Sequence, residues 1–399
     1  MRASAQRAKH ELAARILPAL PTRLRNRLVQ PQYNWSLKEL RPVATANSGD
    51  IRLLVGRANY GGQGYQWARA AETLPGVSAV NLRFLPDDTF IGGPADFNVR
   101  KNVGQWSHLW ARRQRRAIKK DFTHVLIEAE LPLLGGLYDG DLKAEIRDLQ
   151  DAGIKVALVS HGTDTRLPSL HRKLEKDSPF ASPLDGFTEA AEARASANIQ
   201  LMDELGLPEF VSTPDLLQFR PGAKWLPGIS SPERWIDCPP TRLESEVPVV
   251  LHVPGRNGAL KGAPAISAAM HRLQNEGLIE YREIHRASRD EMTAEILNAD
   301  IVVNQVSMGL YATVAVEAML AGRIVVSQVW DSVRDHIKTQ TGKKVPIVEA
   351  NSDTVYDVVK NIVLNPDSFR DLGAKSREFA LTAHSREHAA KVLEDFLRS

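Results

Sequence analysis

The sequence lacks several features that define large classes of enzymes. It holds a single cysteine, Cys238, which excludes an internal disulfide and a cysteine zinc site and fits a reducing, cytoplasmic setting. No run of about 18 apolar residues occurs, so we expect no membrane-spanning helix. The patterns HExxH, GxSxG and Cys–His are absent, which removes support for zinc peptidases and for serine or cysteine hydrolases.

The sequence also has almost no excess of one sign of charge. The net charge is +3 over 399 residues, and no basic stripe interleaved with aromatic residues occurs, so we expect no nucleic-acid partner. Residues 1–30 are locally basic, and their apolar residues recur at helical spacing without the features of a signal peptide. A helix there could lie on an anionic membrane surface or pack on the protein body. Pro18 and Pro21 interrupt its apolar face and favour packing.

Apolar runs alternate with helical patterns through most of the chain. This alternation predicts parallel strands that are buried on both faces and joined by crossover helices. A stretch at 226–248 breaks the alternation and has the Pro, Ser and charge content of a linker. We therefore expect an α/β protein with two Rossmann-like, doubly wound domains facing each other across a cleft. The expected strands are 51–56, 78–84, 124–129, 155–162, 209–214, 247–253, 279–285, 301–306 and 323–328.

These patterns give expected domain boundaries. Ligands of doubly wound sheets bind beyond the carboxyl ends of the strands, so the loops after the strands are the candidate sites. The expected parts are a basic helical segment (1–45), a first Rossmann-like domain (46–228), a linker (229–247), a second Rossmann-like domain (248–375) and a closing helix (376–399).

The loop HVPGRNGALKG, residues 252–262, carries positive charge at the end of an apolar run. It contains Arg256 and Lys261 and no acid, and it precedes a helical pattern. A guanidinium, an ammonium and a helix N-terminus together favour an anion, and a diphosphate is the natural guest. The loop is not a Walker A motif, because Leu260 precedes the lysine and Gly262 follows it. The alternative is a polar loop whose charges face water.

Glu317 lies inside the apolar helical stretch 312–328. A carboxylate in such a place is costly unless it finds a hydrogen-bond donor. Two ribose hydroxyls could serve, since one carboxylate can accept both bonds. The alternative is the exposed face of an amphipathic helix, but the apolar neighbours on all sides favour a binding role.

Glycines follow the first expected strand, at Gly61, Gly62 and Gly64. They let the backbone approach a ligand closely and begin a helix with free N–H groups. A dinucleotide fingerprint would need a further glycine where Trp67 stands, so a dinucleotide site and a dehydrogenase are not favoured.

The stretch SHGTDTR, residues 160–166, places His161 and Asp164 at the end of a buried strand, which is typical of a site. A lone histidine is equally compatible with a structural role. Asp139 and Asp141 could bind a metal, but Asp141 fits the N-cap of the following helix better. We therefore expect no metal.

Three of these motifs resemble those of GT-B glycosyltransferases. They are the Arg/Lys loop, the stretch VEAMLAGRIVVS at 316–327 and the stretch HGTDTRLPS at 161–169. The group that they resemble, often called family 4, includes sucrose- and mannosyl-transferring enzymes. The resemblance implies an acceptor domain followed by a nucleotide-sugar donor domain. It also implies transfer with retention of configuration, without metal or cofactor, in cell-envelope or polysaccharide biosynthesis.

The resemblance also implies roles for single residues. Arg256 and Lys261 would hold the diphosphate and act in catalysis, and Glu317 would bind the ribose hydroxyls. His161 would lie near the transferred sugar as a further catalytic residue. The residues implied near the diphosphate and the acceptor are Gly61, Gly62, Gly64 and Asp164.

One position departs from the family pattern. Gly309 stands where the first of two motif glutamates, eight residues before Glu317, would contact the sugar. The backbone and Ser307, Tyr311 or Thr313 would then hold the sugar.

Two further functions stay open at this point. One is a sugar-nucleotide epimerase, which can share the two-sheet layout. The other is a non-catalytic GT-B-like carbohydrate-binding subunit, which the glycine at 309 keeps in view. The expected partners are a nucleotide sugar and a glycan, lipid or small-molecule acceptor. The expected location is the cytoplasm, with peripheral contact at the inner face of the membrane through the N-terminal segment as an option.

Overall fold

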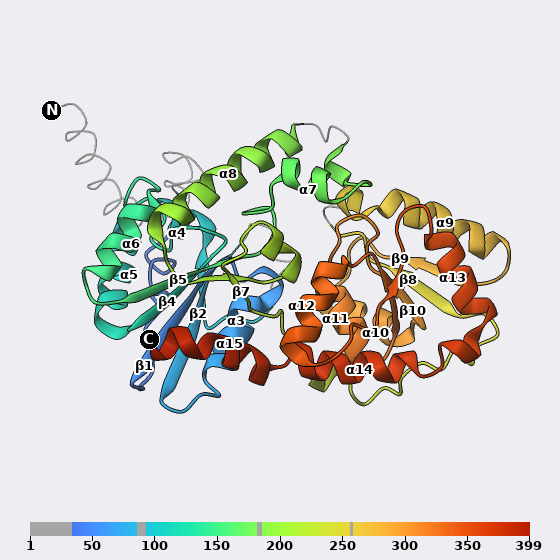
Figure 1. Ribbon diagram of the computed structural model, residues 1–399. Helices are drawn as coiled ribbons and strands as arrows, with labels where there is room; N and C mark the ends of the chain where they lie inside the picture. Colours follow the sequence, from blue (N-terminus) through green and yellow to red (C-terminus); the bar gives the residue numbers. More distant parts are fainter. Residues whose placement is uncertain (1–33, 86–92, 182–185, 256–257) are drawn as a thin grey trace. The chain divides into compact units, whose positions relative to one another are not determined.

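The computed structural model describes residues 34–85, 93–181, 186–255 and 258–399 (Figure 1). The chain divides into two compact units. Unit 1 comprises the residues up to Ser160 together with 200–210 and 389–399, and unit 2 comprises 161–199 and 211–388. The boundaries expected from the sequence stay a prediction, and most of the basic segment expected at 1–45 lies outside the described residues.

The first part of the chain, up to Ser160, alternates strands and helices. Its elements are β1 (Ile51–Arg57), η3 (Tyr60–Gly62), α3 (Gln63–Ala71), β2 (Val77–Leu85), β3 (Phe97–Arg100), α4 (Lys101–Trp106), α5 (His108–Asp121), β4 (His124–Glu128), α6 (Leu142–Gln150) and β5 (Lys155–Ser160). Helix α6 begins as expected, because the Asp141 carboxylate accepts a hydrogen bond from the Ala144 N–H at 3.0 Å.

The middle of the chain has more helices than strands. Its elements are α7 (Pro168–Leu174), η4 (Pro179–Ala181), α8 (Phe187–Leu205), β6 (Glu209–Val211), η5 (Pro214–Gln218), β7 (Lys224–Trp225) and η6 (Pro232–Arg234).

The last part of the chain returns to regular alternation. Its elements are β8 (Val249–His252), η7 (Gly258–Lys261), α9 (Ala263–Asn275), β9 (Glu280–Glu283), α10 (Arg289–Asn298), β10 (Ile301–Val303), α11 (Thr313–Leu320), β11 (Ile324–Ser327), α12 (Asp331–Thr341), β12 (Val348–Glu349), α13 (Val355–Leu364), η8 (Pro366–Ser368), α14 (Leu372–Ala383) and α15 (Arg386–Arg398). Each helix in the described part of the chain is too short or too polar to cross a bilayer.

The strands form two sheets. A seven-stranded sheet has the order β3-β2-β1-β4-β5-β6-β7, and a five-stranded sheet has the order β12-β11-β10-β8-β9. The pairs around β1, β4, β8 and β10 are parallel. The protein therefore has two parallel-sheet α/β domains, which confirms the expected fold class.

The five-stranded sheet is buried on both faces. Along β10, Ile301 and Val303 pack into one apolar cluster and Val302 into another, and β11 alternates in the same way. Side chains along a strand point alternately to the two faces, so each face has its own core of helices. At the central strands β10 and β11, polar groups can therefore gather only at the strand ends, whereas the edge strand β9 carries exposed and half-buried polar side chains.

All nine strands expected from the sequence are present, with ends shifted by a few residues. Three further strands, β3, β7 and β12, were not expected. β7 and β12 are only two residues long, too short to show a period in the sequence.

A buried ion pair holds the segment 161–166 inside unit 2. The Arg166 guanidinium donates to the Asp215 carboxylate at 3.1 Å from Nε and 2.5 Å from a terminal nitrogen. Both side chains are buried. The pair ties the end of this segment to η5.

We predict that Asp215→Ala lowers the free energy of unfolding by about 3–5 kcal/mol, because it leaves the Arg166 charge buried and unpaired. Urea denaturation followed by tryptophan fluorescence measures the change. Glu378→Ala is the matched control, since it removes an exposed pair with Lys343 and should cost less than about 1 kcal/mol. Equal, small effects of the two changes would contradict the prediction.

Candidate functional site

Each sheet has one point where the strand order reverses direction. In the five-stranded sheet this point lies between β8 and β10, because β9 follows on one side and β11 on the other. The loops after β8 and β10 leave the same edge of the sheet side by side. Ligands of doubly wound sheets bind at such points, so these two loops form the candidate site of unit 2.

The loop after β8 carries Lys261, which is partly buried. Its ammonium lies beside Gly255, where an added Cβ would be 3.3 Å from Nζ. Burial lowers the pKa of Lys261 below its usual value, because the charged form loses solvation. No carboxylate of the described residues pairs with it. Arg256, the other expected cation, lies outside the described residues.

Two helices begin at this edge without a capping side chain. Helix α9 starts after Gly262 and α11 after Ala312, and neither has an acidic residue in its first turn. Uncapped N–H groups and the positive end of the helix dipole both favour an anion. They add to the charge of Lys261 on the same edge of the sheet.

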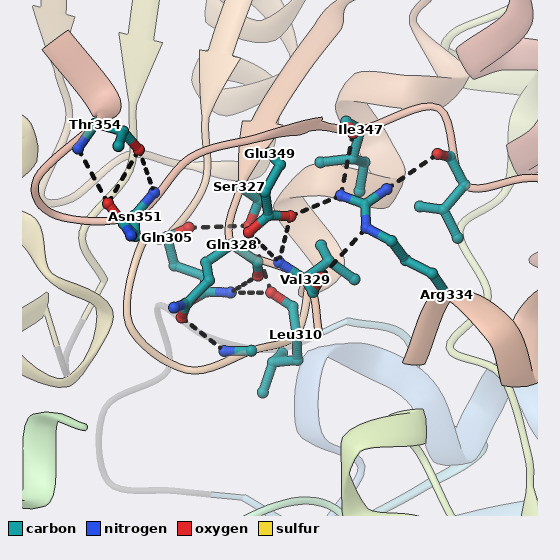
Figure 2. A network of polar contacts seen from close by, with 12 residues as sticks. Gln305, Leu310, Ser327, Gln328, Val329, Arg334, Ile347, Glu349, Asn351 and Thr354 are labelled. Carbon is teal, nitrogen blue, oxygen red and sulfur yellow. Dashed lines mark hydrogen bonds and ion pairs between the residues drawn. The ribbon is translucent and has the colours of Figure 1, made fainter. Parts of the chain in front are cut away.

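The loop after β10 is held by two glutamine side chains. The Gln305 oxygen accepts hydrogen bonds from the Ser307 N–H at 3.2 Å and the Met308 N–H at 2.8 Å. The Gln328 oxygen accepts from the Gly309 N–H at 3.1 Å. The Gln305 amide also donates to the carbonyls of Gln328 and Leu310, as Figure 2 shows. Three successive N–H groups of the loop thus have side-chain partners.

Gly309 has a backbone reason to be glycine. Its φ of 70° lies in the left-handed region, and an added Cβ would overlap the Trp330 indole. The backbone N–H of Trp330 also donates to the Gly309 carbonyl at 3.0 Å. The ring fills the volume that a side chain at 309 would need.

Other expected sugar ligands of this loop have partners within unit 2. The Ser307 hydroxyl donates to the Leu260 carbonyl at 2.8 Å, which joins the two loops. The Tyr311 hydroxyl donates to His384 at 2.9 Å in a buried position, and Thr313 is exposed at the start of α11. Contact of these residues with a sugar remains a prediction, and at Tyr311 a ligand would have to replace an existing bond.

Glu317 lies on α11, partly buried, and accepts no hydrogen bond from the described residues. Burial raises its pKa to about 7, although Arg289 and Arg234 act in the opposite direction. A partly buried carboxylate with no hydrogen-bond donor loses part of its solvation without compensation. A ligand that brings hydroxyl donors would correct this.

The rest of the motif at 316–327 has structural partners. Arg323 is buried and donates to the carbonyls of Ala299 and Pro239 at 3.1 and 2.8 Å. An added Cβ at Gly322 would lie 2.7 Å from the Pro240 Cα. These contacts fix the stretch around Pro240 against the end of α11, so they explain part of the motif without a ligand.

His161 and Asp164 lie in one tight turn of unit 2. The Asp164 carboxylate accepts hydrogen bonds from the backbone N–H groups of His161, at 2.6 Å, and of Gly162. The acid therefore stabilises the turn, and both its oxygens are engaged. The catalytic role of His161 and the ligand role of Asp164 remain predictions.

The expected glycine loop lies in unit 1, at the point where the seven-stranded sheet reverses between β1 and β4. Gly61 and Gly62 have positive φ. Gly64 covers Glu128, whose carboxylate would lie 2.8 Å from an added Cβ and accepts from the Asn59 N–H at 2.9 Å. A buried carboxylate beneath the loop disfavours a second anion there.

Sequence reasoning missed Gln305 and Gln328, although a signal was present. Both lie at the carboxyl ends of the expected strands 301–306 and 323–328, where polar side chains are candidates for a site. It also missed Glu175, at the end of α7, which contacts Gln328 from 153 residues away along the chain. No local pattern in the sequence predicts that contact.

Comparison with solved structures identifies the fold. The chain is similar to sucrose-phosphate synthase from Thermosynechococcus elongatus, with a TM-score of 0.56 and 15% identity over 87% of this chain and 98% of that one. It is similar to a glycosyltransferase from Rickettsia africae, with a TM-score of 0.53 and 13% identity over 87% and 97% of the two chains. HepE of Anabaena, solved with UDP and glucose, gives a TM-score of 0.50 and 11% identity over 87% and 99%.

No family model matches the chain, and no curated protein matches it. The likeness at these identities concerns the fold. The protein has the two-domain fold of the GT-B glycosyltransferases.

We predict that Glu317→Gln stabilises the ligand-free protein at pH 8, by roughly 1–2 kcal/mol. The pKa of Glu317 in the folded chain, about 7, exceeds the ordinary value of 4.5, so folding favours the protonated carboxyl. The stabilisation that the protonated Glu317 contributes to the wild-type fold is therefore fully present below pH 4.5 and is lost as the pH rises through 7.

Urea denaturation at pH 8, 6.5 and 5 measures the difference, which should shrink as the pH falls. Glu246→Gln, at an exposed position, is the control and should change little. A Glu317→Gln protein less stable than wild type at pH 8 would show that the carboxylate is favourably paired.

Proposed function

We propose that unit 2 binds the nucleotide of a nucleoside-diphosphate sugar and that the chain transfers the sugar to an acceptor hydroxyl. The observation that carries this proposal is the Lys261 ammonium. It is partly buried at the reversal point of the sheet and has no carboxylate partner among the described residues. A diphosphate would supply the missing negative charge.

The other groups at this edge fit the same ligand. The uncapped start of α11 offers N–H groups to phosphate oxygens, that of α9 offers fewer because Pro264 has no N–H, and Arg256 would add a second cation. Such donors can neutralise a leaving diphosphate, so we propose that no divalent ion or other cofactor is needed.

The proposed reaction needs little chemistry from side chains. The bond between the sugar C1 and the phosphate oxygen breaks, and the acceptor oxygen forms the new bond to C1 on the same face. The acceptor proton passes to the leaving phosphate oxygen, which gives a nucleoside diphosphate and a glycoside with retained configuration. The chain supplies position and positive charge, with His161 near the transferred sugar.

The glycine loop of unit 1 is better suited to the acceptor than to the diphosphate. The carboxylate of Glu128 lies directly beneath Gly64, so a further anion would be repelled. The Glu128 carboxylate would not repel a neutral acceptor that carries hydroxyl groups. We propose that Gly61 and Gly62 approach such an acceptor, whether glycan, lipid or small molecule.

Membership of family 4 and a role in cell-envelope or polysaccharide biosynthesis are part of the same proposal, based on the resemblance of the motifs. So are a cytoplasmic location and peripheral membrane contact through residues 1–30, which lie outside the described residues. UDP-glucose is the first donor to test, because HepE was solved with UDP and glucose.

The direct test combines a donor panel with an acceptor panel. We expect one UDP- or GDP-sugar to raise the melting temperature and to release nucleoside diphosphate faster when methyl glycosides are added. Lys261→Ala should weaken binding of that nucleotide by about 30-fold or more, because it removes the partly buried cation. Calorimetry measures the affinity, and a coupled assay measures the release.

The control is Lys338→Ala, at an exposed position on α12, which should change neither quantity. Conversion of the donor to its epimer without release would favour an epimerase. Binding without either reaction would favour a carbohydrate-binding subunit. Full affinity in Lys261→Ala would remove the site assignment.

The ribose role of Glu317 has a separate test. We expect the wild-type protein to bind UDP more tightly than 2′-deoxy-UDP, by roughly tenfold or more for a hydrogen bond to a charged group. Glu317→Ala should bind the two equally, because the carboxylate that accepts from the hydroxyl is gone. A preference that persists in the variant, measured by calorimetry, would rule out this role.

A further inference from the structure

A carboxylate at the end of α7 reaches the loop after β11, which contacts the loop after β10 through Gln328 and Gly309. Glu175 directly follows α7, and both it and the loop belong to unit 2. Its Oε2 accepts hydrogen bonds from the Trp330 Nε1–H at 2.9 Å and from the Gln328 amide at 3.0 Å. Its Oε1 accepts from the Asp177 N–H at 3.1 Å. The backbone of Asp177 therefore holds one oxygen of the carboxylate, and the side chains of Gln328 and Trp330 both donate to the other oxygen.

Glu175 determines how the Gln328 amide is oriented. An amide has one end that accepts and one that donates, whereas a carboxylate only accepts. With its Nε2 donating to Glu175, Gln328 must turn its oxygen toward the Gly309 N–H, which it accepts at 3.1 Å. Without the carboxylate, both orientations of the amide become available, and only one of them satisfies Gly309.

Glu175 also fixes the Trp330 ring. The indole lies directly against Gly309, where no Cβ could fit, and its N–H ends at the carboxylate. His171 lies on α7, the helix that ends just before Glu175. Its ring centroid is 5.1 Å from that of Trp330, and its Nε2 is 3.5 Å from the Met308 carbonyl oxygen. The segment from α7 to η4 therefore contacts both the ring and the loop that the ring supports.

The loop in turn holds the backbone of Lys261. The Val306 N–H donates to the Lys261 carbonyl at 3.0 Å, and the Ser307 hydroxyl donates to the Leu260 carbonyl at 2.8 Å. An added Cβ at Gly262 would also press on Val306. A continuous set of contacts thus runs from the carboxylate through Gly309 to the backbone of the buried lysine.

We propose that Glu175 is a positioning residue for nucleotide binding. By fixing Gln328 and Trp330 it sets the backbone of residues 306–309, and through it the place of Lys261. This inference rests on the proposed nucleotide site but adds to it a residue that would not touch the ligand.

The segment offers a matched control. Glu192 on α8 is also half-buried, and it accepts from the Ser169 N–H at 2.8 Å and from the Ser169 hydroxyl at 2.6 Å. It thus anchors the start of α7, whereas Glu175 stands at its end. No contact of Glu192 with the loop 305–312 is present in the described residues.

The experiment compares Glu175→Ala, Glu175→Gln and Glu192→Ala in the full chain, with UDP and the best donor of the panel as probes. We expect Glu175→Ala to lower the affinity for UDP about tenfold, as loss of bonds to a charged group would. Glu175→Gln, which keeps one oxygen acceptor, should lose less. The UDP affinity of Glu192→Ala should stay within about twofold of the wild-type affinity, because Glu192 shares no partner with the loop.

The ¹⁵N–¹H signal of the Trp330 indole gives a second readout. Its assignment comes from the signal that disappears in Trp330→Phe. We expect it to shift in both Glu175 variants, since its hydrogen-bond acceptor changes, and to stay in place in Glu192→Ala. Urea denaturation of each variant records any general loss of stability.

Three outcomes would overturn the inference. Unchanged UDP affinity in Glu175→Ala, while the wild type binds UDP, would do so. Equal losses of affinity and of stability in Glu175→Ala and Glu192→Ala would reduce Glu175 to an ordinary structural contact. An unmoved indole signal would show that Glu175 does not hold Trp330. A wild-type chain that binds no nucleotide of the panel would instead remove the proposed function, and this role with it.

Discussion

A parallel sheet that is buried on both faces leaves only the ends of its strands for polar chemistry. In the five-stranded sheet, alternate residues of β10 and β11 belong to two different apolar cores. The hydrophobic effect that stabilises these cores also excludes water from both faces. At these central strands, charged groups can therefore gather only in the loops after the strands, and the reversal between β8 and β10 brings two such loops together.

At that edge of the sheet, the ammonium of Lys261 and the carboxylate of Glu317 do not pair with each other. Lys261 has a lowered pKa and Glu317 a raised one, and burial is the main cause in both. If the two groups were paired, each would shift the other in the opposite direction. Burial thus disfavours the charged form of both groups, and each pKa unit corresponds to about 1.4 kcal/mol. A ligand with an anionic part and a hydroxyl-bearing part would relieve both.

The sequence predicts the fold well and the site in part. Strands such as 301–306 are recognisable because burial on both faces requires continuous apolar runs, and the reversal rule then indicates the loops. The two-residue strands β7 and β12 have no such signal. At Gly309 the sequence indicates a missing acid, but the reason, a tryptophan ring from the next loop, depends on tertiary packing. Glu175 is hidden for the same reason, since its partners are more than 150 residues away.

The close fit of Gly309, Trp330 and Glu175 limits how this loop can change. Any side chain at 309 displaces the indole, and a displaced indole leaves the carboxylate without one of its two side-chain donors. The three positions therefore tolerate replacement only together. A chain that carries an acid at 309 would need a smaller residue at 330 and a different group at the end of α7. Substitutions at these three positions are therefore expected to occur together.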